Sequence, residues 1–149
     1  MQTESTHHVL TVLYPLYKEE VYRRREQMMK LTAWGAMGLI AMLFGILLNP
    51  YKTRLTGAES WLIGLAAVVW CGLFCSLILQ QQYRHRLAKQ ILIQLERTLG
   101  FYEEGLFVEN QALYPDGWQT AWLGDKSGTV YFICLGIMTS LVLLALRFI

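Results

Sequence analysis

Three cysteines are the first residues whose chemistry has to be considered. Cys71 and Cys75 lie four residues apart, so on a helix they share one face, and Cys134 lies far along the chain. A redox pair needs C-x-x-C spacing and a structural zinc site needs four Cys or His ligands, so the spacing matches neither. All three thiols fall in uncharged apolar runs, where a thiol behaves as a small apolar residue. We expect them to pack against neighbouring helices, and we predict neither a metal nor another cofactor.

Carboxylates form the second group of reactive side chains, at Glu103, Glu104, Glu109 and Asp116. Acid–base catalysis requires carboxylates held in a positioned pair with shifted pKa values. An exposed acidic loop is the favoured interpretation here, and an enzyme acting at the membrane face through Glu103 and Glu104 is the alternative. The string GDKSGT (124–129) has Asp where a phosphate loop needs Lys. We therefore predict that the chain is not an enzyme.

The elements that must position these residues are set by three long apolar runs. The chain of 149 residues is 54% hydrophobic and 16% charged, against roughly 45–50% and 25% in soluble proteins. An uncharged helix of about 18–20 residues covers the roughly 30 Å hydrocarbon core of a bilayer. Leu31–Leu48, Trp61–Leu79 and Val130–Phe148 have this length and are apolar on all sides. They predict an all-α polytopic membrane helix bundle with three transmembrane helices, the first two extending into the cytoplasm.

Basic residues in the connecting segments predict the orientation of these spans. Five Lys or Arg residues precede the first span, two lie between the first and second, five between the second and third, and one, Arg147, lies at the C-terminal end. The positive-inside rule then places the N-terminus and residues 80–128 in the cytoplasm and the C-terminus outside. Six of these residues lie close to the spans and are expected to serve as topology signals or to contact anionic lipid: Arg23, Arg24, Arg25, Arg84, Arg86 and Lys89. Their position beside the membrane makes nucleic acid an unexpected partner.

The segment before the first span is predicted to be helical. Pro15 suits a first helical turn, and no helix breaker follows it, so one helix is expected over about 15–48. Two favourable i,i+4 ion pairs are expected within it, Glu19 with Arg23 and Glu20 with Arg24.

A second amphipathic arm follows the second span. Leu87, Ile91, Leu95 and Leu99 recur every fourth residue, and Gly100 is a plausible residue just past the helix end. This stripe is expected to pair with the first arm or with a copy in a neighbouring subunit.

The segment over 101–128 has a different composition from the two arms, because it is rich in aromatic and turn residues. Trp118 and Trp122 lie close to the third span, where aromatic rings commonly settle at the headgroup level. A short amphipathic helix over 119–123 on the inner leaflet is predicted, with a partner-binding surface as the alternative.

Small residues within the spans predict close helix packing. Small side chains four apart let helix backbones approach in lipid, where the hydrophobic effect does not drive association. The residues in question are Ala41, Gly45, Gly64, Ala67, Cys71, Gly72, Cys75, Ser76, Gly136 and Ser140. No span carries an ionisable residue of the kind that ion and substrate pathways usually need, apart from Arg147 at the very end of the third. Assembly within a membrane is therefore favoured over transport by a single chain.

The order of these parts resembles the SLATT family of bacterial membrane proteins. A charged helix running into the first span (YKEEVYRRREQMMKLTAWG) and a basic, apolar helix after the second (YRHRLAKQILIQLERTLGFY) carry the likeness, over about residues 15–102. The resemblance implies a two-span protein that acts as a membrane effector beside nucleotide-sensing defence components. The third span and the Trp-rich segment depart from that pattern, so no functional residue is carried over.

Together these patterns predict four regions: a cytoplasmic arm over 1–30, two spans over 31–80, a cytoplasmic segment over 81–128 and a third span over 129–149. We expect a non-catalytic structural, scaffold or interaction subunit of a membrane assembly in a bacterial inner membrane. Its expected partners are membrane lipids and either further copies of itself or other membrane subunits. The alternative is an oligomeric pore-forming or membrane-perturbing effector.

Overall fold

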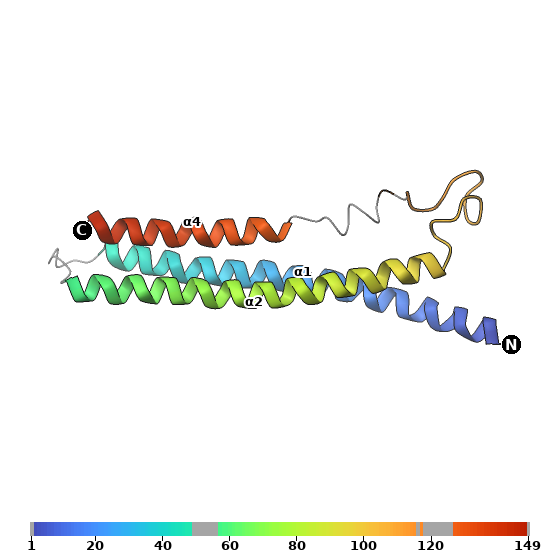
Figure 1. Cartoon of the computed structure of the whole chain (residues 1–149), viewed down its shortest axis with the longest axis horizontal. Coiled ribbons are helices and arrows are strands. Elements are labelled where there is room, and N and C mark those ends of the chain that lie inside the picture. The colour runs from blue at the N-terminus through green and yellow to red at the C-terminus, as the bar shows by residue number, and fades with distance from the viewer. Residues whose placement is uncertain (1, 49–56, 116, 118–126, 149) are drawn as a thin grey trace. The chain divides into compact units, whose positions relative to one another are not determined.

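The fold is all-helical over the part of the chain that is described. The computed structural model describes residues 2–48, 57–115, 117 and 127–148, and contains α1 (Gln2–Leu47), α2 (Gly57–Thr98) and α4 (Ser127–Phe148) (Figure 1). All three helices are long and apolar enough to span a membrane, which confirms the three predicted spans by length and composition. The chain divides into two compact units, which we describe separately.

The start of α1 differs from the prediction, because α1 runs through Pro15 instead of opening at it. A proline within a helix removes one backbone donor and costs about 3 kcal/mol. Tyr14 and Tyr17, on either side of the proline, both pack against a buried cluster, and this packing offsets the cost. The two ion pairs expected nearby are present: Arg23 Nη2 lies 3.0 Å from Glu19 Oε1, and Arg24 pairs with Glu20.

The first unit comprises Met1–Glu26 and Gln82–Lys126. Val21 of α1 packs against Ala88 and Leu92 of α2, so the N-terminal part of α1 and the C-terminal part of α2 share a small core. The described part of the segment that follows α2, drawn in orange, forms a loop beyond the end of α2 (Figure 1). The predicted pairing of the two arms therefore occurs within this chain.

The second unit comprises Gln27–Gln81 and Ser127–Ile149, and its three helical segments lie side by side (Figure 1). The buried residues of its core cluster are Leu39 and Ile46 of α1, Ala67 and Ile78 of α2, and Leu135 and Val142 of α4. The pairs on α1 and α4 are seven residues apart, so each returns to the same face after two turns. Most other large apolar side chains of this unit face outward, as a lipid surround requires.

The indole of Trp70 on α2 contacts α1 within this unit. Trp70 Nε1 donates a 3.1 Å hydrogen bond to the carbonyl oxygen of Gly35, and its ring lies against Gly38. A Cβ at Gly38 would sit 2.5 Å from that ring, so only glycine fits without a shift. This contact satisfies the indole donor in a setting without water.

Candidate functional site

The end of α2 is built by a glycine turn that redirects the chain. Gly100 has φ +77°, its N–H bonds the Arg97 carbonyl at 3.0 Å, and the Phe101 N–H bonds the Glu96 carbonyl at 3.0 Å. These are the two hydrogen bonds of a Schellman motif, and a residue with positive φ at that point is most easily glycine. Gly100 therefore lies just past the helix end, as predicted.

Aromatic rings hold the chain that leaves this turn. The Phe101 ring makes edge contacts with Tyr14, Phe107 and Tyr114, with centroid distances of 5.4, 5.5 and 5.6 Å. The backbone closes the same loop, because the Tyr114 N–H donates to the Phe101 carbonyl at 3.0 Å. Edge-on aromatic pairs contribute about 0.5–1.5 kcal/mol each beyond burial, so the cluster fixes the segment on α1.

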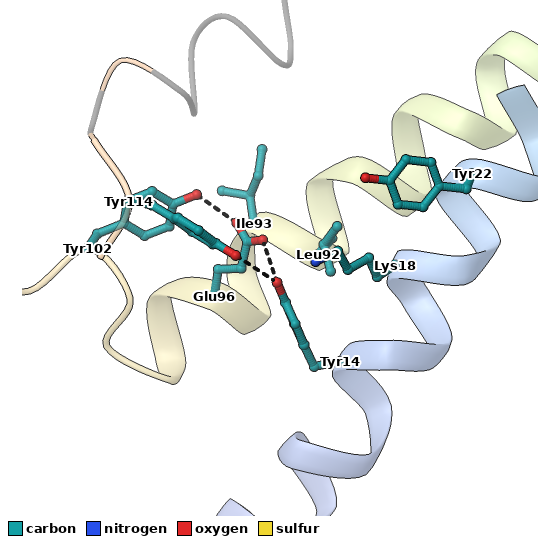
Figure 2. Close-up of a pocket in the computed structure, with 8 residues that line it drawn as sticks. All are labelled: Tyr14, Lys18, Tyr22, Leu92, Ile93, Glu96, Tyr102 and Tyr114. Carbon is teal, nitrogen blue, oxygen red and sulfur yellow. Dashed lines mark hydrogen bonds between the residues drawn. The ribbon is translucent and has the colours of Figure 1, made fainter. Parts of the chain in front are cut away.

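A buried carboxylate lies at the centre of this region. Glu96 is only 6% exposed, and it accepts hydrogen bonds from the Tyr102 hydroxyl at 2.7 Å and the Tyr14 hydroxyl at 3.4 Å. The Tyr14 and Tyr114 hydroxyls are 3.2 Å apart, and Figure 2 shows all three phenols converging on Glu96. Burial, with the neighbouring Glu96 and Tyr114, raises the pKa of Tyr14 and of Tyr102 above the usual phenol range. Both phenols are thus neutral hydrogen-bond donors at ordinary pH.

A cavity of about 100 Å³ opens beside this carboxylate. Lys18 and Tyr22 of α1 and Leu92 and Ile93 of α2 complete its lining (Figure 2). The Lys18 ammonium lies 5.6 Å from the centre of the Tyr14 ring, at cation–π distance. The space suits a few water molecules or a very small polar molecule, and the carboxylate and phenols serve chiefly to hold α1, α2 and the following segment together.

The predicted leucine stripe is divided between two environments. Leu95 and Leu99 are buried, whereas Leu87 and Ile91 remain about 40% exposed, at 42% and 39%. An i,i+4 step advances 400° around a helix, so the stripe drifts about 40° at each step, away from a fixed contact face. The buried residues of this part of α2 include the polar side chains His85, Lys89 and Glu96. The apolar ones are Ala88, Leu92, Ile93, Leu95 and Leu99.

The predicted basic residues are also placed differently from one another. Arg23, Arg25, Arg84 and Arg86 are exposed and could meet lipid headgroups, and Arg24 is held in its ion pair with Glu20. Lys89 is only 7% exposed, which places it with the buried face of α2.

The small residues of the spans separate into an inner and an outer group. Ala67 is in the core, Cys71 and Cys75 pack against it, and Gly64 lies close to α4. The outer group consists of three exposed pairs, one on each helix: Ala41 with Gly45, Gly72 with Ser76, and Gly136 with Ser140. Apart from the adjoining residues and backbone of the same helix, no described atom lies within 4 Å of a Cβ built on Gly45, Gly72 or Gly136.

Two hydroxyls of these outer pairs are satisfied within their own helices. Ser76 donates to the Gly72 carbonyl and Ser140 to the Gly136 carbonyl, each at 2.8 Å. Such i−4 bonds let a serine face lipid or another helix without an unpaired donor.

The sequence did not predict the Tyr14–Glu96–Tyr114 network or the Trp70–Gly38 contact. The predicted pairing of the two helical arms did indicate that the part of α1 holding Tyr14 would meet the part of α2 holding Glu96. Trp118, Trp122 and the helix predicted over 119–123 lie outside the described residues. Within the described ranges, no group of three or more His, Cys, Asp or Glu side chains is arranged to hold a metal ion.

No protein-family model matches the chain, and neither the curated proteins nor the solved structures contain a match to it.

Proposed function

We propose that the chain is a non-catalytic integral membrane protein that acts as a structural or interaction subunit of a membrane assembly. The observation that carries this proposal is the outward position of the small-residue pair on each of the three helices. Helices in lipid associate through close backbone approach, because lipid tails are as apolar as the side chains they would replace. Each pair offers such an approach to a helix of another copy or another subunit.

The proposed orientation places the first unit in the cytoplasm of a bacterial cell. The alternation of basic residues along the chain supports an internal N-terminus and an external C-terminus. The aromatic cluster and the Glu96 network give the cytoplasmic part an ordered structure of its own. An engineered cysteine at Thr56 that labels only from the cytoplasm would contradict this orientation.

Replacement of the outward glycines tests the assembly proposal. Gly45→Ile, Gly72→Ile and Gly136→Ile add a bulky side chain to an open face without touching the core, so each variant should keep its fold. We expect at least one to shift the purified complex to a smaller mass in native mass spectrometry. Ile40→Leu on α1, Leu73→Ile on α2 and Ile137→Leu on α4, all at exposed positions, are the matched controls. A complex of unchanged mass in all three glycine variants would contradict the proposal.

A pore-forming effector of the SLATT type remains the second candidate. It is favoured by the uninterrupted course of α1 and α2, which run for 46 and 42 residues and so continue beyond their apolar spans. Purified protein in liposomes separates the two candidates. A closed homo-oligomer that releases a trapped dye supports the effector, and a stoichiometric foreign subunit without leakage supports the interaction role.

A further inference from the structure

We propose that a groove between α2 and α4 binds one anionic phospholipid, with an acyl chain lying along Gly64 and the phosphate at Arg147. The groove has a volume of about 690 Å³ and lies entirely within the second unit. It is independent of the outward small-residue pairs, because none of those six residues lines it.

The floor of the groove is apolar and is kept open by a glycine. Leu65 and Val68 of α2 and Leu143 and Leu146 of α4 form its walls around Gly64. A Cβ on Gly64 would lie 3.4 Å from Leu143 Cδ2 and 3.7 Å from Leu146 Cδ1, at ordinary contact distance. Alanine would therefore fit, whereas a longer side chain would extend into the space that a lipid chain would use.

The polar end of the groove has the composition of a headgroup site. Ser60 and Trp61, in the first turns of α2, line the groove together with Arg147 in the last turn of α4. Tryptophan and arginine are typical of the level at which helices leave the hydrocarbon region. A guanidinium binds phosphate oxygens through two parallel hydrogen bonds, and it retains its charge at any ordinary pH.

An acyl chain suits the groove better than water or another helix. Water needs two to four polar partners, and the floor around Gly64 supplies apolar side chains. The phosphate of a phospholipid would meet the Arg147 guanidinium, a charge complement that an apolar helix does not supply. A flexible chain fills a narrow apolar groove and gains dispersion contacts along its length.

Native mass spectrometry of the full-length protein in mild detergent tests the proposal, with phosphatidylglycerol and phosphatidylcholine as probes. We expect one retained phosphatidylglycerol per chain and weaker retention of phosphatidylcholine. Val68→Trp should abolish the adduct, whereas Val69→Trp, on a neighbouring exposed position outside the groove, should keep it. Gly64→Leu and Gly72→Leu form a second matched pair, since Gly72 faces open space away from the groove.

The proposed contact between Arg147 and the lipid phosphate is tested by the preference for phosphatidylglycerol over phosphatidylcholine. Arg147→Gln should lower the preference for phosphatidylglycerol over phosphatidylcholine about fivefold, since one basic residue near the membrane surface contributes about that factor. Circular dichroism of every variant establishes that the helices persist, and Gly64→Ala should bind as the unmodified chain does. Retention of the lipid by both Val68→Trp and Gly64→Leu, or an unchanged preference in Arg147→Gln, would overturn the site. The oligomer mass measured in the same spectra reports separately on the proposed assembly role.

Discussion

The Tyr102 hydroxyl donates a 2.7 Å hydrogen bond to Glu96, which lies six residues earlier in the chain, on the other side of the Schellman turn. The bond links the segment after α2 to a carboxylate that is 6% exposed. A buried carboxylate is costly without donors, so this bond stabilises both the turn and the charge.

Tyr102→Phe should therefore destabilise the first unit. Loss of a hydrogen bond to a charged group costs about 1.5–3 kcal/mol, and the partial exposure of Tyr102 favours the lower end of that range. We expect faster amide hydrogen exchange over residues 96–114 with unchanged exchange in the second unit. Tyr83→Phe, at an exposed position in the same unit, is the control and should leave exchange unaltered.

The same phenols predict how the first unit responds to alkaline pH. The pKa of Tyr14 and that of Tyr102 are raised, mainly by burial, so the folded state holds both protons more tightly than the unfolded state. This contribution to stability is complete below the unfolded pKa of about 10 and is lost as pH rises through the folded values. Protection of the amides over 96–114, measured relative to the intrinsic base-catalysed exchange rate, should fall above about pH 10. The double variant Y14F/Y102F should lose the phenolate absorbance that develops last. Loss of absorbance from the phase near pH 10, with the last phase unchanged, would contradict the assignment.

The sequence predicted those features whose physical cause is local. Uncharged apolar runs are enough to predict the three spans, and i,i+4 spacing is enough to predict Glu19–Arg23. The first glycine after a long helical stretch is enough to predict the helix end at Gly100. Pro15 misled the prediction of where α1 begins, because the cost of an internal proline is offset by tertiary packing that a local rule does not include.

The candidate site was far harder to predict, because its contacts join distant residues. Tyr14 meets Glu96 and Tyr114 across 82 and 100 positions of sequence, and nothing local to Glu96 in the sequence marks it as buried. The Trp70–Gly38 contact depends on the rotation of α2 against α1, which periodicity alone does not define when both helices are apolar on all sides.

Gly38→Ala should weaken the second unit through that contact. The added Cβ would lie 2.5 Å from the Trp70 ring, and forcing extra volume into a packed interface typically costs about 1–3 kcal/mol. We expect a lower thermal midpoint in detergent, with quenching or a spectral shift of tryptophan fluorescence. Gly45→Ala faces open space and should match or exceed the stability of the unmodified chain, because alanine is the better helix former. Equal midpoints for Gly38→Ala and Gly45→Ala would contradict the packing described for Trp70.

Pro15→Ala tests whether tertiary packing offsets the cost of the proline in α1. Alanine restores a backbone donor and relieves a cost of about 3 kcal/mol, while Tyr14 and Tyr17 keep their contacts with the small core of the first unit. Amide exchange over 9–20 should slow in the variant, and exchange over 96–114 should stay the same because the Glu96 network is intact. If exchange over 96–114 became faster instead, the proline would be required to orient Tyr14 toward Glu96. In that case Pro15 would be part of the network's geometry, and not a local defect that the network tolerates.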